Sequence, residues 1–179
     1  QLNDQGIEKN HQSVLVFDAD QEDRAKLKQA YKTLLGDYPK FHKMDMLSKI
    51  GVLMMETLTQ DITLDDNAAL IFANRTSSKH TDVLYDESKL NGAPSPSLFV
   101  YTLPNIILGE LSIKHKWHGE SIFLLNSTPS FEFYEELVIS FSNYPNLNKF
   151  VLGWVDYEEG KLDGRILVVE REEVGTEQD

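Results

Sequence analysis

A chain of 179 residues, 41% of them hydrophobic, is long enough for one buried core and too short for two ordinary domains. The 29 Asp and Glu outnumber the 17 Lys and Arg, and the net charge of −12 disfavours nucleic acids and anionic membranes, which are polyanions, as partners. The absence of cysteine excludes disulfides, thiolate metal sites and thiol nucleophiles.

The ends of the chain carry little structural signal. Residues 1–12 and the acidic stretch 172–179 are expected to be flexible, which leaves a single domain over residues 13–171. The apolar stretches are too short for a membrane helix, and the first residues lack the basic and apolar regions of a signal peptide. We therefore expect a cytoplasmic protein.

The first part of the chain alternates strand and helix patterns. Residues 13–18 (SVLVFD) predict a buried strand, and a helix with apolar 3-4 spacing follows, closed by Gly36. Asp45 can cap a second helix, and the four methionines of the chain lie in this helix or just before it. Residues 68–74 (AALIFAN) predict the second strand. The polar run 75–96 is expected to be a long functional or partner-ordered loop, because ordinary connections take about 4–6 residues.

The second part predicts three further strands. A helix can begin at Pro104, residues 121–126 (SIFLLN) form the third strand, and 130–142 form the next helix. Residues 149–158 and 165–172 read as two strands, joined by the short connection EGKLDG into an antiparallel hairpin. The expected fold is α/β, with a mostly parallel five-stranded mixed sheet, an antiparallel last strand and helices on both faces.

The order strand, tight turn, helix over residues 118–137 is typical of a nucleophile turn, because a helix N-terminus stabilises developing negative charge. The turn offers the hydroxyls of Ser127, Thr128 and Ser130. However, a Gly-x-Ser-x-Gly elbow is absent, and Pro129 removes an N–H from the place where an oxyanion would be bound. The residues alone indicate an α/β domain without a visible active site.

A basic cluster occupies residues 114–116. His115 and His118 are three residues apart, but no third ligand follows at metal-binding distance and Lys114 and Lys116 are cationic neighbours. We therefore interpret Lys114, His115 and Lys116 as a small basic rim, and expect neither a metal nor a cofactor.

The segment PSPSLFVYTLPNIILGELSIKHKWHGESIFLLN, residues 94–126, resembles the N-terminal half of β-ketoacyl-acyl-carrier-protein synthases, members of the thiolase-like family. The shared features are a Ser/Pro-bearing loop, a Pro-Asn helix start, and a glycine ahead of the strand that leads to the nucleophile, here Gly119. Residues 41–58 and the strand FVLGWVDYEE are also similar to family segments. The likeness covers residues 37–170 and implies a single thiolase-like half.

The departures from the family concern its catalytic groups. The family nucleophile is a cysteine nine residues after the glycine, and that position is Thr128 here, with Ser127, Pro129 and Ser130 as neighbours. A threonine hydroxyl needs an adjacent general base, and the family's basic residues lie in a second half. The resemblance therefore implies a degenerate relative of chain-length-factor type, or a short synthase-like protein of aryl-polyene or flexirubin-type clusters, that is not an enzyme on its own.

The resemblance also implies a partner. Thiolase-like dimers form by antiparallel pairing of the strand before the nucleophile, here Ser121, Ile122, Phe123, Leu124, Leu125 and Asn126. We expect this strand to pair with a full-length ketosynthase, as a heterodimer, or with a second copy. Such a subunit would stabilise a synthase of fatty-acid or polyketide biosynthesis or shape its acyl tunnel, and acyl carrier protein would bind only through the partner. Two alternatives stay open: a weakly active acyltransferase or condensing enzyme using Thr128 or Ser130, and a carrier-protein adaptor that docks through Lys114, His115 and Lys116.

Overall fold

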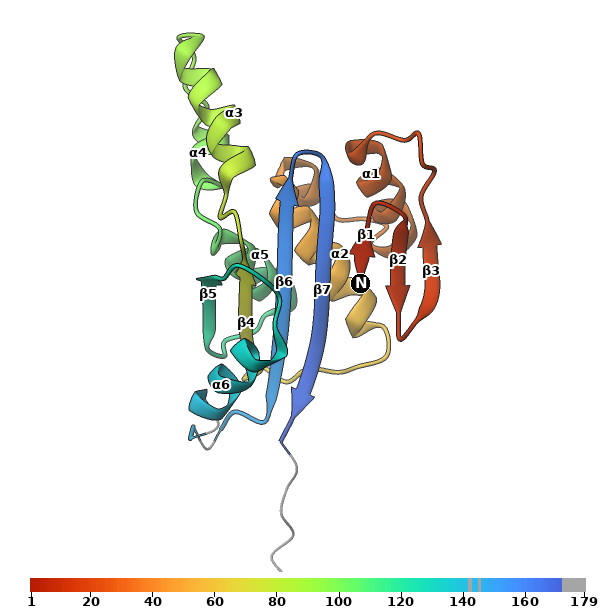
Figure 1. The fold of residues 1–179 in the computed structure, drawn as a ribbon, viewed down its shortest axis with the longest axis vertical. Helices are drawn as coiled ribbons and strands as arrows, with labels where there is room; N and C mark the ends of the chain where they lie inside the picture. The colour runs from red at the N-terminus through yellow and green to blue at the C-terminus, as the bar shows by residue number, and fades with distance from the viewer. Residues whose placement is uncertain (142, 145, 172–179) are drawn as a thin grey trace, which may run out of the picture.

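The computed structural model describes residues 1–141, 143–144 and 146–171. In these residues seven strands form one sheet, in the order β3-β2-β1-β7-β6-β4-β5 (Figure 1). The strands are β1 (Leu2–Asn3), β2 (Gly6–Lys9), β3 (Gln12–Val16), β4 (Ala69–Asn74), β5 (Ser121–Leu125), β6 (Lys149–Glu158) and β7 (Lys161–Glu170).

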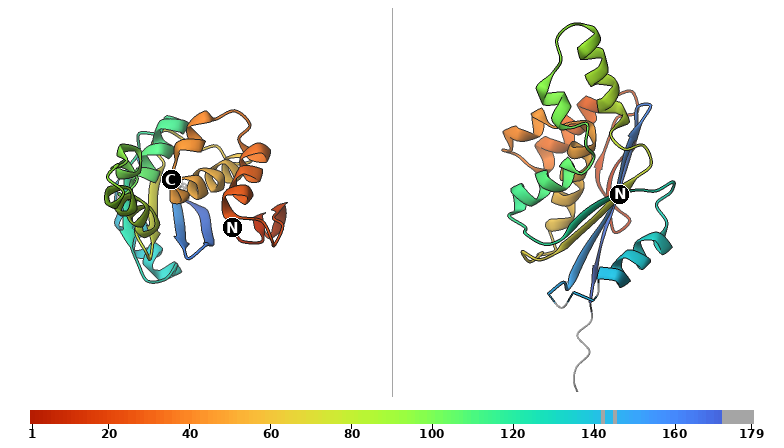
Figure 2. Two further views of the ribbon diagram at one scale, coloured as in Figure 1. Left: turned by 90° about the horizontal axis from the view of Figure 1, so that it is seen from above. Right: turned by 90° about the vertical axis from the view of Figure 1, so that its left-hand side faces the viewer.

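Helices cover both faces of the sheet, as expected. They are α1 (Asp23–Leu34), the 3-10 helix η1 (Pro39–Lys43), α2 (Met46–Thr59), α3 (Lys79–Leu90), α4 (Pro96–Val100), α5 (Ile106–His115) and α6 (Phe131–Phe141). Figure 2 shows α1, α2 and α5 on one face and α6 on the other. Helices α3 and α4 project beyond the end of the sheet (Figure 1).

The predicted number of strands, five, is wrong, because the described sheet has seven. The additional strands, β1 and β2, lie within residues 1–12, which the sequence indicated as flexible. Leu2 and Ile7 are fully buried there, and β1 pairs antiparallel with β7. The burial of Leu2 and Ile7 and the pairing with β7, from the far end of the chain, hold residues 1–12 in the sheet. These residues include too few apolar side chains to predict a strand from sequence alone.

The strand directions also differ in part from the prediction. Only β4, β5 and β6 pair in parallel, whereas β7, β1, β2 and β3 continue the sheet through antiparallel pairs. The predicted first strand, here β3, is therefore an outer strand rather than part of the parallel core. The last two strands do form the antiparallel hairpin, but its turn is only Glu159 and Gly160, both with positive φ, as a two-residue hairpin requires.

The core is divided by the sheet into two clusters. Along β4 every residue is buried, and alternate side chains face opposite layers. Leu70 and Phe72 pack with α2 and α5, whereas Ile71 packs with α6. The α2 helix begins as predicted, since the Asp45 side chain accepts a hydrogen bond of 3.0 Å from the Ser48 N–H.

Two further predictions concern residues 75–96 and residues 172–179. The polar run 75–96 is not a plain loop, because it contains α3, a helix in which only Thr81 is buried. The expected tail 172–179 lies outside the described residues. In the part of the chain that the structure describes, we find no helix with the length and hydropathy needed to span a membrane.

Candidate functional site

The candidate site lies where β4 and β5 end side by side. The Asn126 N–H donates to the Asn74 carbonyl oxygen over 2.9 Å, which continues the parallel pairing into the turn. Asn74 is fully buried, and its side-chain amide both donates to and accepts from the Ser77 backbone at 2.9 Å. Ligands of open α/β sheets bind beyond the carboxyl ends of the strands, so this edge is where a site is expected.

The predicted nucleophile turn, residues 126–130, is held by its own polar groups. The Ser127 N–H donates to Asn126 Oδ1 over 3.0 Å, and Asn126 Nδ2 donates to the Thr128 carbonyl over 3.0 Å. The Ser130 N–H donates to the same carbonyl, again over 3.0 Å. The strand, turn and helix therefore follow one another as the sequence indicated.

The hydroxyl groups of Ser130 and Thr128 have different surroundings in the turn. Ser130 Oγ accepts a hydrogen bond of 3.2 Å from the Phe133 N–H, which makes Ser130 the cap of α6. Thr128 is exposed, and among the described residues its hydroxyl has no hydrogen-bond partner. A threonine without an adjacent base remains protonated and is a poor nucleophile.

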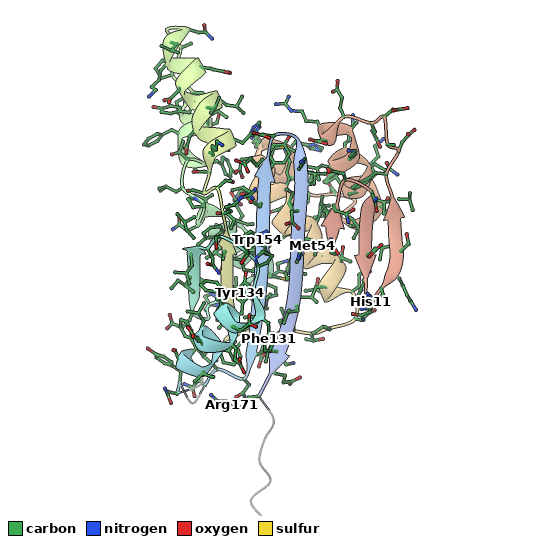
Figure 3. All side chains as sticks on the ribbon, in the orientation of Figure 1. His11, Met54, Phe131, Tyr134, Trp154 and Arg171 are labelled. Carbon is green, nitrogen blue, oxygen red and sulfur yellow. The ribbon has the colours of Figure 1, made fainter. Side chains whose placement is uncertain are left out.

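A cavity of about 200 Å³ adjoins the turn. It is lined by Pro129, Ser130, Phe131, Tyr134, Leu152, Trp154, Arg165, Ile166 and Leu167. Figure 3 shows Phe131 and Tyr134 on α6, below Trp154 of β6. The lining is mostly apolar, so the cavity has the character of a packing surface rather than of a catalytic centre.

The polar groups of this cavity are already engaged. The Tyr134 hydroxyl donates to the Gly153 carbonyl over 2.6 Å, and burial raises the pKa of its phenol. Trp154 Nε1 and Arg165 Nε each donate to the Asp163 carboxylate, over 3.1 Å in both cases. Neither a histidine nor a carboxylate is among the described residues that line the cavity.

The predicted interface strand, β5, lies at an open edge of the sheet. Within the described residues it pairs only with β4. The Glu120 carbonyl and the Asn126 N–H bond to β4, so the even-numbered residues direct their backbone groups inward. Ser121, Phe123 and Leu125 direct theirs outward, because the hydrogen-bonding direction alternates along a strand.

The side chains of β5 divide between the two faces of the sheet. Phe123 packs towards α2, whereas Ile122 and Leu124 pack towards α6. Leu125 is 61% exposed at the end of the strand. An unpaired apolar edge of this kind readily accepts another strand.

The predicted basic rim is only partly a surface feature. Lys114 Nζ and His115 Nε2 contact the same carboxylate oxygen of Glu56, at 2.6 and 3.1 Å, and His115 stacks on Trp117. Burial opposes ionisation of Glu56, but the hydrogen bonds from His115 and Lys114 outweigh it and hold its pKa below the ordinary value. Lys116 alone of the three is exposed, at the left-handed end of α5.

Sequence reasoning missed two groups beside these positions. Glu56 is an inward-facing acid of α2, and nothing in the spacing of that helix indicates its partners on α5. Trp154 and Leu167 join the cavity beside the turn from β6 and β7. The alternation of side chains along those strands could have placed them on the α6 face. Leu167 lies directly opposite Leu152, and Trp154 is two residues from Leu152, so the three side chains point to the same face of the sheet.

Comparison with known proteins gives a likeness in structure alone. No protein-family model and no curated protein matches the chain. A chain in the structure of the ketosynthase ApeO with its chain length factor ApeC, from Xenorhabdus doucetiae, matches with a TM-score of 0.55 and 15% identity. The ishigamide ketosynthase/chain length factor matches with a TM-score of 0.60 and 12% identity.

The chain has the fold of ketosynthase and chain-length-factor subunits. The matches cover 75% and 80% of this chain, but only 61% and 48% of the solved chains. The resemblance indicated by residues 94–126 is thereby confirmed as a likeness of fold. The matched part of the chain therefore spans about three fifths of one solved chain and about half of the other.

Proposed function

We propose that this chain is a non-catalytic, ketosynthase-like subunit that pairs with a complete ketosynthase. The observation that carries the proposal is the open edge of β5. In a fold of this type that strand precedes the nucleophile turn, and here its outward backbone groups at Ser121, Phe123 and Leu125 have no partner strand in the described chain. A neighbouring strand would satisfy these groups and cover Leu125.

The turn beside this edge supports a role without catalysis. Thr128 stands at the family nucleophile position, Ser130 is used as a helix cap, and no base lines the adjoining cavity. The alternative, a weakly active acyltransferase using Thr128 or Ser130, would need a base from another chain. The open edge and the missing base are explained together by a subunit that supports a catalytic partner.

The partner we propose is a ketosynthase of fatty-acid or polyketide biosynthesis, of the aryl-polyene type that the sequence resembles. The matched structures are ketosynthase and chain-length-factor assemblies, which supports this choice over pairing of two copies. Within such a pair the chain would stabilise the synthase or contribute wall residues to its acyl tunnel.

We assign carrier-protein recognition to the partner alone. An adaptor that docks through Lys114, His115 and Lys116 would need all three cations at the surface, yet Glu56 engages two of them. The net charge of −12 would also repel an acidic carrier at long range.

Co-expression with full-length ketosynthases of the proposed type tests the proposal. Affinity capture followed by native mass spectrometry is expected to give a complex with one copy of each chain. A second copy in place of the synthase would identify a homodimer. A stable monomer that captures none of these synthases would overturn the proposal.

A further inference from the structure

A second cleft is lined by residues of α1, η1 and the start of α2. Figure 1 shows α1 at the opposite side of the molecule from β5. Its volume is about 350 Å³, within the range of small-molecule sites. It is lined by Arg24, Leu27, Lys28, Phe41, His42, Met44, Met46 and Lys49. The lining contains no carboxylate, although the chain carries 29 of them.

The basic groups of this cleft come from three separate elements. Arg24 and Lys28 are one turn apart on α1 and so share a face of that helix, while His42 and Lys49 come from η1 and α2. Within the described residues none of the four lies within 4.0 Å of a carboxylate oxygen. On a chain of net charge −12, the arginine and two lysines among them are an uncommon concentration of positive charge without a carboxylate partner.

The charges in the cleft repel one another. Burial lowers the pKa of Lys49, Asp45 counteracts this, and the nearby Arg24 lowers the pKa further. Asp45 is the acidic group that acts on Lys49, yet its carboxylate is used by the Ser48 N–H at 3.0 Å and the Thr81 hydroxyl at 3.3 Å. An added anion would therefore relieve a repulsion that the fold itself leaves in place.

The floor of the cleft is apolar. Leu27, Phe41, Met44 and Met46 are each at most 6% exposed. An arginine and two lysines that line the same cleft as these apolar residues match a ligand with two parts, an anionic group and an apolar one. Guanidinium binds phosphate through paired hydrogen bonds, and the lysines add point charges.

We propose that this cleft binds a small phosphate ester with an apolar moiety. The phosphate lies between Arg24, Lys28 and Lys49, and the apolar moiety contacts Phe41 and Met44. A concave site with a buried apolar floor suits a small molecule, whereas an acidic protein surface would use the cations and leave the floor empty. The assignment does not rest on the proposed pairing with a ketosynthase.

Calorimetric titration of the full chain with phenyl phosphate at low salt tests the site, with phenol and inorganic phosphate as partial probes. We expect saturable binding of one equivalent, tighter than that of either partial probe. Arg24→Gln and Lys49→Met should each weaken binding at least about tenfold, because each removes a charge-assisted contact. Lys32→Gln is the matched control, since Lys32 is an exposed cation of the same helix outside the cleft.

Three outcomes would overturn the assignment. They are binding that does not saturate, an equal loss in Lys32→Gln, which would show attraction by surface charge alone, and binding of a poly-glutamate peptide but not of phenyl phosphate. Arg24 is exposed, so Arg24→Gln is expected to fold, and circular dichroism checks this for both variants. Capture of a ketosynthase is unaffected by any of these results.

Discussion

On one face of the sheet, α2 buries eleven of its fourteen residues, whereas on the other face α6 buries only Tyr134. The α6 side also keeps large apolar side chains at the surface, with Phe131 at 65% and Leu167 at 45% exposed. Helix α2 is therefore packed almost entirely within this chain. The α6 face and the adjoining β5 edge retain apolar surface of the kind that another chain covers.

The same substitution, leucine to alanine, should change the unfolding free energy very differently in these two regions. Leu53→Ala removes a fully buried side chain of α2 and is expected to cost about 2–5 kcal/mol of unfolding free energy, through lost burial and the cavity left behind. Leu125→Ala, at 61% exposure on β5, should change it by less than about 0.5 kcal/mol. Urea denaturation of the isolated chain measures both, and similar losses would show that the β5 edge is already packed.

A pair of glycines tests how tightly the α2 side is filled. A Cβ on Gly153 would lie 2.7 Å from the Phe72 ring, so Gly153→Ala should cost about 1–3 kcal/mol by overpacking. Apart from the backbone of its own helix, no atom lies within 4 Å of a Cβ on Gly109 in α5. Gly109→Ala should therefore stabilise the chain by about 0.5–1 kcal/mol through helix propensity. Thermal unfolding decides, and a neutral Gly153→Ala would indicate a looser core than described.

The Glu56 cluster gives a smaller, pH-dependent effect. Because the folded pKa of Glu56 lies below its ordinary value of 4.5, its ionised form stabilises the fold above that pH, and the contribution is lost as the pH falls through the folded pKa. Glu56→Gln should therefore be less stable than the native chain at pH 7 and approach it at lower pH. Glu135→Gln on the exposed side of α6 is the control. A gap that stays constant with pH would contradict this role.

The parts of the fold predicted from sequence are those with local signals. Asp45 caps α2, the run in β4 is buried along its whole length, and Gly160 marks the hairpin turn. The failures depend on contacts across the chain. β1 is two residues long and exists through its pairing with β7, while α3 buries only Thr81 and so lacks an apolar stripe.

For the candidate site too, the local structure was predicted from the sequence and the contacts between elements were not. The strand, turn and helix around Thr128 follow directly from apolar runs and the capping Ser130. The partners of Lys114 and His115 could not be foreseen, because Glu56 belongs to another helix and its approach depends on how α2 packs with α5. The same limit hid the cleft beside α1, whose cations come from three elements.

The most direct test of the account compares Leu125→Pro with Leu125→Ala in the complex with a full-length ketosynthase. Proline removes the outward N–H of Leu125 and blocks pairing of another strand, whereas alanine keeps the N–H and removes only the side chain. Native mass spectrometry should show the one-to-one complex with the Leu125→Ala chain and at least about tenfold less of it with Leu125→Pro. A complex that forms equally well with both, while both chains stay folded, would contradict pairing through the edge of β5.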